Sequence, residues 1–138
     1  MEPFVSDDQV QSQIIEDCAA QLPPLALKGI QLFNAGHYFE AHEELENAWR
    51  QETRPVRELY RGVLQVAVAY YHISRGNLVG AQKMFKRSKR WLAPFPDVCQ
   101  GIHVGQVQRD AAAVELALQS HTPQEVLDLH LLKPVQMD

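Results

Sequence analysis

The chain has 138 residues, of which 46% are hydrophobic and 22% are charged, and its formal net charge is −4. This length and composition predict one globular domain over residues 1–138, large enough to bury a core without a structural metal or disulfide bonds. The net negative charge removes any general attraction to the phosphates of nucleic acids or to anionic membranes. We therefore expect neither a membrane nor a nucleic acid as a partner.

Three features indicate a cytoplasmic protein. Residues Met1–Phe4 contain neither the basic nor the apolar part of a signal peptide. The longest apolar stretch, Val63–Ile73, has about half the length of a membrane span. Cys18 and Cys99 are far apart in the sequence and lack CxxC spacing, which predicts two reduced, partly buried thiols in a reducing compartment.

Hydrophobic periodicity and capping signals predict helices along most of the chain. Ser6 and Gln9 form a capping box at the start of a helix over about residues 7–22, which Pro23-Pro24 ends. Glycine and proline signals then separate further helices, expected over about residues 25–35, 38–50, 56–74 and 78–92, with C-terminal helices within about 104–131 that include a second capping box at Thr122–Glu125. No segment alternates for long with period two, so we expect no strands.

An internal repeat relates two of the expected turns. Residues 35–41 align with residues 75–81 at an offset of 40 residues. In each copy an apolar helix is followed by a glycine turn and then by a helix with an early alanine, which predicts two tandem tetratricopeptide-like hairpins. Because two copies are too few for a solenoid, we expect the outer helices to close the pair into a compact all-α bundle of about six to seven helices.

The third and fourth expected helices carry the side chains best suited to form a site. His42 and Glu46 lie along the edge of the apolar stripe of the third helix, and Glu43 follows just beyond. Such an edge is half buried, and there ligands bind and pKa values shift. The fourth helix is apolar except for a narrow stripe that includes Arg61 and Gln65. Since a buried polar group needs a partner, we predict an ion pair from Arg61 to Glu46 or Glu43.

This polar cluster has three interpretations. Its side chains could serve only to fix the register of the helices. They could bind a small molecule or the end of a peptide. They could also bind a metal, because His42 and Glu46 have the i, i+4 spacing of two ligands on one helix and His72 is a candidate third ligand. No HExxH, repeated ExxH or nucleophile-elbow motif points to a known metalloenzyme or serine hydrolase.

The fifth expected helix is strongly basic. No acidic residue lies between Glu58 and Asp97. The cations of this helix are Lys83, Lys86, Arg87, Lys89 and Arg90. They predict a solvated face whose charges suit the C-terminal end of a helix, and the alternative is a surface for an acidic partner. A single-stranded nucleic acid would require more interleaved aromatic residues than Trp91 alone provides.

These residues together resemble the motif of the family called domain of unknown function 309. The matching blocks are Phe39–Glu43, Leu45-Glu46 with Trp49, Tyr60–Gly62 with Gln65, and Gly76-Asn77, within about residues 27–92. The resemblance implies a compact all-helical fold. Its pattern includes the polar cluster, which favours a site over a scaffold, but it implies no activity.

We therefore predict a helical binding or scaffold protein with a polar pocket between the third and fourth helices and with Trp49 largely buried beneath the fourth. The residues expected to bind the ligand are His42, Glu43, Glu46, Arg61 and Gln65. We expect no cofactor, and the partner is a small molecule or another protein. The alternative is a metal-dependent enzyme, a hydrolase, with His42, Glu46 and His72 as candidate ligands. Enzymatic activity and oligomeric state stay open.

Overall fold

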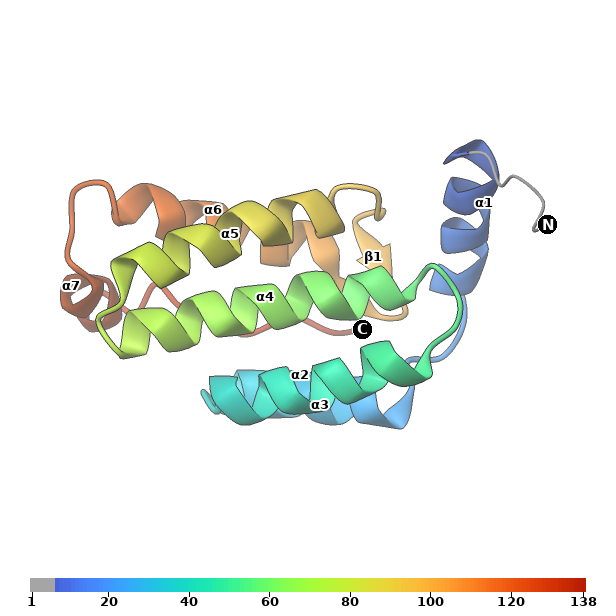
Figure 1. The fold of residues 1–138 in the computed structure, drawn as a ribbon, viewed down its shortest axis with the longest axis horizontal. Coiled ribbons are helices and arrows are strands. Elements are labelled where there is room, and N and C mark those ends of the chain that lie inside the picture. The colour runs from blue at the N-terminus through green and yellow to red at the C-terminus, as the bar shows by residue number, and fades with distance from the viewer. Residues whose placement is uncertain (1–6) are drawn as a thin grey trace.

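A computed structural model describes residues 7–138, and it is built from helices (Figure 1). The elements in chain order are α1 (Asp7–Cys18), α2 (Pro24–Asn34), α3 (Tyr38–Gln51), α4 (Arg57–Ser74), α5 (Leu78–Leu92), β1 (Val98–Cys99), β2 (Ile102–His103), α6 (Val104–Ala117) and α7 (Pro123–Asp128). The all-α prediction is confirmed. The first predicted capping box begins at Ser6, which lies outside the described residues.

The helices from α2 to α5 pack in chain order, each against the next. Gly36 and Gly76 end α2 and α4 with φ angles of 81° and 73°, a left-handed conformation that glycine adopts without strain. Asn77 then caps α5, because its side-chain oxygen accepts a hydrogen bond of 2.9 Å from the backbone N–H of Gly80. These local signals place the ends of α2, α4 and α5 close to where the sequence predicts them, whereas α1 ends at Cys18 and not at about residue 22.

The core lies mainly around α4, as its apolar sequence predicts. Its fully buried large side chains include Tyr60, Val63, Tyr70 and Ile73. Glycine allows α5 to approach closely: a Cβ atom added at Gly62 would lie only 2.4 Å from Leu92 Cδ2. The burial of one face of each neighbouring helix against α4 supplies most of the driving force for folding this part of the chain.

The C-terminal segment returns from α7 along the bundle to the small hairpin (Figure 1). Asn34 of α2 holds it at Val135: the Asn34 side chain donates to the carbonyl at 3.0 Å and accepts from the N–H at 2.7 Å. The backbone N–H of His103 in turn donates to Gln136 O at 3.0 Å. α7 begins with the predicted capping box, in which Thr122 and Glu125 exchange side-chain and backbone hydrogen bonds.

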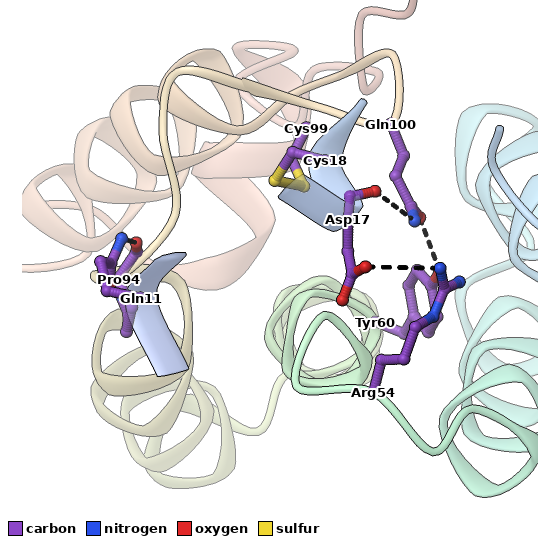
Figure 2. The surroundings of a disulfide bond; sticks show 8 residues. All are labelled: Gln11, Asp17, Cys18, Arg54, Tyr60, Pro94, Cys99 and Gln100. Atoms are coloured by element: carbon purple, nitrogen blue, oxygen red, sulfur yellow. Dashed lines mark hydrogen bonds and ion pairs between the residues drawn. A yellow bond between two sulfur atoms is a disulfide. The ribbon is translucent and has the colours of Figure 1, made fainter. Parts of the chain in front are cut away.

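Two expectations are wrong at the hairpin. β1 and β2 are strands of two residues each, too short to show the alternation by which strands are recognised. Cys18 and Cys99 form a disulfide across 81 residues of sequence, not two reduced thiols (Figure 2). The pairing follows from the path of the chain, because α1 packs on β1 and brings the two Cα atoms within 4.3 Å.

The helices described for residues 7–138 are all too short or too polar to cross a membrane. The single domain over residues 1–138 and the cytoplasmic location stay predictions. The tetratricopeptide-like geometry of the two hairpins also stays a prediction, although α2 to α5 do follow one another as packed neighbours.

Candidate functional site

One face of α4 is half exposed although the helix is central. Its members recur at helical spacing and stand on one side of the helix. They are Arg57, Glu58, Arg61, Leu64, Gln65, Val68, Tyr71 and His72. α3 and α5 both pack on α4 and border this surface, which we call the α4 face. Arg61 and Gln65, predicted to share a polar stripe of α4, therefore lie on a partly exposed surface between α3 and α5.

Arg61 joins three helices at one end of the α4 face. Its guanidinium carbon lies 4.5 Å from the ring centroid of Trp49 on α3 and 4.0 Å from that of Trp91 on α5. Arg57 covers the Trp49 ring as well, at 4.2 Å. A cation over the face of an aromatic ring is attracted to the ring electrostatically, and a planar guanidinium can also stack on it. Trp49, predicted to be largely buried, is partly buried and packs against the core.

The ion pair of Arg61 differs from the predicted one. Its Nε atom lies 2.8 Å from Glu58 Oε2, one turn earlier on the same helix, whereas Glu46 or Glu43 of α3 was expected. The physical reason is proximity: an i, i+3 partner is reached along a single helix, and from α3 it is the Trp49 ring that contacts the guanidinium.

The predicted residues on α3 do not all lie together. Glu46 accepts a hydrogen bond of 2.7 Å from Arg50 and lies 3.4 Å from His42 Nε2. Glu43 is exposed to solvent, while Glu44 is half buried and pairs with Lys28 of α2 at 3.5 Å. α3 packs between α2 and α4, so its glutamates are divided between the solvent side and the edges that face the neighbouring helices.

A cavity of about 200 Å³ lies at the other end of the α4 face. Its lining residues are Tyr38, Phe39, His42, Val68, Tyr71 and His72. His42 and His72 thus line one cavity, but Nδ1 of His72 lies 3.3 Å from the side-chain amide of Asn77, where it acts as an acceptor. Within residues 7–138 no three His, Cys, Asp or Glu side chains gather as metal ligands, so His42 and Glu46 form a pair only.

Two polar atoms near Arg61 are buried without a hydrogen-bond partner among the described residues. They are Nε1 of Trp49 and Oε1 of Gln65. An unpaired buried polar atom costs about 1–3 kcal/mol relative to a paired one. Most native structures contain few such atoms, and each calls for a physical explanation.

The basic side of α5 borders the α4 face. Lys83 and Arg87 are exposed and lie eight and four residues before Trp91, hence on the same side of the helix. Lys86 is also exposed, but it is three residues before Lys89, which pairs with Glu115 of α6 on the other side. The cations beside the α4 face therefore include Lys83 and Arg87, together with Arg90, whose guanidinium carbon lies 5.1 Å from the ring centroid of Trp91.

Comparison with known proteins gives a family without an assigned activity. Residues 26–84 match the model of the Domain of unknown function (DUF309), which confirms the resemblance. The chain is similar to an uncharacterized protein of Aquifex aeolicus (strain VF5), with 29% identity over 77 residues, 55% of this chain and 23% of that protein. It is also similar to the uncharacterized protein YpuF of Bacillus subtilis (strain 168), with 43% identity over 56 residues, 40% of this chain and 32% of that protein.

The limits of these matches bear on the site. The chain spans less than a third of the length of both relatives. The family match includes Trp49, Arg61 and Gln65 but ends before Trp91. The second aromatic ring on Arg61 therefore comes from a part of this chain that the family model does not cover.

Proposed function

We propose that this chain is a helical binding protein and that the α4 face is its binding surface. The position of Arg61 carries the proposal, because its guanidinium lies between two tryptophan rings on a half-exposed surface. Tryptophan and arginine are the residues most enriched among those that dominate binding energy at protein interfaces. A cluster that served only to hold the helices together would be expected in the interior.

The unpaired atoms of Trp49 and Gln65 support a site over a scaffold. Side chains that only fix helix register gain most when every buried polar atom has a partner. Here an indole N–H and an amide oxygen are left unpaired among the described residues. Functional surfaces often contain such destabilising unpaired atoms, because their residues are selected for binding and not for stability.

The chemistry of the α4 face favours a partner helix with one acidic edge. Leu64, Val68 and Tyr71 offer apolar contacts along the middle of the surface. Lys83 and Arg87 add positive charge along the α5 side. An amphipathic helix places an apolar stripe and a charged edge at this spacing, and opposite charges would fix its orientation. With a net charge of −4 the whole chain would not attract nucleic acid, so we propose a protein partner.

A metal-dependent hydrolase is not our proposal. Of its three candidate ligands, only His42 and Glu46 are within reach of each other as a pair, and Nδ1 of His72 is already engaged with Asn77. We keep the cytoplasm as the proposed location. In that compartment a disulfide such as Cys18–Cys99 would form and break with redox conditions, since reducing systems keep most thiols reduced.

Tryptophan fluorescence tests the proposal directly, because the chain has two tryptophans and both contact Arg61. A synthetic amphipathic peptide helix with glutamates along one edge should shift the wavelength of tryptophan emission. The shift should reach a plateau as the peptide concentration rises. The same peptide with lysines in place of those glutamates should bind more weakly.

Two neighbouring cations of α5 provide matched variants for this titration. Arg87→Glu should weaken binding of the glutamate peptide, whereas Lys86→Glu, on the side away from the α4 face, should have little effect. Equal loss in both variants, or no saturable shift with either peptide, would contradict the proposed binding surface.

A further inference from the structure

Helix α1 has a weak hold on the bundle by its own apolar contacts. It stands at one end of the molecule, across the direction of the long helices (Figure 1). Only Ile14 and Asp17 are buried among its described residues, while Ile15 is 57% exposed. A helix that buries one apolar side chain gains little from packing, so covalent and polar contacts must hold it in place.

Those contacts converge on the C-terminal end of α1 (Figure 2). Cys18 is bonded to Cys99, and the backbone N–H of Gln100 donates to Cys18 O at 2.8 Å. The side chain of Gln100 donates to Asp17 O at 3.1 Å and accepts from Tyr60 Oη at 2.6 Å. The hairpin that carries Cys99 and Gln100 is therefore the anchor of α1.

Two further contacts are weaker or more remote from the anchor. Asp17 is 5% exposed, and its Oδ1 atom lies 3.5 Å from Nη1 of Arg54, a guanidinium already engaged with Glu52. Gln11 donates a hydrogen bond of 2.6 Å to Pro94 O. We expect both contacts to depend on the anchor keeping α1 in position.

The position of α1 matters for the proposed site. A cavity of about 340 Å³ lies between α1 and the adjoining ends of α4 and α5. Val10 and Ile14 line it from α1, while Glu58 and Trp91 line it from the other side. Glu58 and Trp91 are the ion-pair partner and one of the two stacking partners of Arg61. α1 therefore stands directly beside the Trp91 end of the α4 face.

We propose that the Cys18–Cys99 disulfide is a redox-operated clasp, which holds α1 against the Trp91 end of the α4 face and releases it when a dithiol reduces the bond. This inference rests on the proposed function, because it assigns to α1 the control of access to the same binding surface. We expect the change to be confined to α1 and its surroundings, because α2 to α5 pack mainly on one another and not on α1.

The chemistry of release is a thiol–disulfide exchange. Cys99 is fully buried and Cys18 is half buried, so a thiolate of the dithiol attacks the Cys18 sulfur and Cys99 leaves as a thiolate, which takes up a proton. The second thiol of the reductant then attacks the mixed disulfide and frees Cys18. Overall the protein gains two electrons and two protons, and the dithiol becomes a disulfide.

Hydrogen exchange of the oxidised and reduced full chain tests the clasp without any ligand. Dithiothreitol should speed exchange of the α1 amides by about tenfold or more, while the amides of α4 should keep their rates. A variant with both Cys18→Ser and Cys99→Ser should resemble the reduced protein in either buffer. Unchanged α1 rates would overturn the proposal. Equal acceleration in α1 and α4 would overturn it too, because the bond would then hold the whole fold together.

Acrylamide quenching supplies a second readout with a matched control. In a Trp49→Phe protein the single remaining indole, Trp91, should be quenched more strongly after reduction. In a Trp91→Phe protein the remaining Trp49, which does not line the cavity beside α1, should change little. Equal quenching of Trp91 in both redox states would contradict the role of α1. Because neither readout uses a peptide, a failure of peptide binding would count against the proposed function alone.

Discussion

The helices from α2 to α5 and the segments around them are held by different kinds of contact. In the first region each helix packs on the next through apolar faces, and short turns join them. In the second, α1 and the C-terminal segment depend also on single bonds between distant residues, such as Cys18–Cys99 across 81 residues and Asn34–Val135 across 101. Distributed packing tolerates the loss of one contact, whereas a segment held by few specific bonds can be released by one change.

The largest effect should come from the core of the first region. Leu45 is fully buried in α3, and its side chain fills the space beside Gly29 of α2. Leu45→Ala should lower the free energy of unfolding by about 2–5 kcal/mol, because it removes apolar contacts and leaves a cavity. Urea titration measures the loss, and Leu116→Ala, at a side chain that is 65% exposed, is the control with little expected change.

The link between the two regions should give a smaller and more local effect. Asn34→Ala removes both hydrogen bonds to the backbone of Val135, and the unpaired groups cost about 1–3 kcal/mol. Limited proteolysis should therefore cut near the C-terminus sooner, while α2 to α5 keep their resistance. Asn47→Ala on the exposed side of α3 is the matched control. Faster cutting throughout the chain would mean that the segment is part of one cooperative unit.

The α4 face should contribute least to stability within the first region. The Arg61 and Glu58 side chains are 27% and 26% exposed, so Arg61→Met leaves a partly exposed carboxylate, although the Glu58 oxygen that faces Arg61 is buried. We expect a loss of about 1 kcal/mol, from the weakened cation–π contacts and a half-exposed ion pair. Adding Glu58→Gln should change the urea midpoint little further. A loss of unfolding free energy several times larger would mean that Arg61 mainly stabilises the fold.

Acid should weaken the junction at the start of α4. The hydrogen bonds from the Arg54 side chain hold the pKa of Glu52 below its ordinary value of 4.5. A lowered folded-state pKa gives stability that is complete above 4.5 and is lost as the pH falls through the lowered value. Below pH 4.5 the free energy of unfolding should therefore fall less steeply with decreasing pH in Glu52→Gln than in the unchanged protein. The exposed Glu43→Gln serves as the comparison, and identical pH dependence in both variants would contradict this role for Glu52.

The first region could be predicted from the sequence because its signals are local. The range expected for α5, residues 78–92, agrees with the structure since Asn77 caps its start and proline follows its end. In the second region, the position of α1 against the hairpin could not be predicted in the same way. The disulfide and the bonds of Gln100 depend on how α1 and the hairpin meet, and no local pattern encodes that meeting.

The candidate site was predictable in part. Helical periodicity predicts Arg61 and Gln65 on one stripe of α4, and both lie on the partly exposed side of that helix. The i, i+3 spacing of Glu58 and Arg61 is a local signal for the observed ion pair, because it places the two side chains next to each other on one helix. Contact of Trp91 with Arg61 depends on how closely α5 approaches α4, which rests on a glycine-to-leucine packing that the sequence alone does not specify.

NMR shift mapping of the isotope-labelled chain with the glutamate-edged peptide tests the binding surface most directly. The account predicts the largest shifts at the indole N–H groups of Trp49 and Trp91 and at the amides of Arg61 and Gln65, with little change in α6 and α7. Shifts concentrated around Lys86 and Glu115, on the other side of α5, would contradict it.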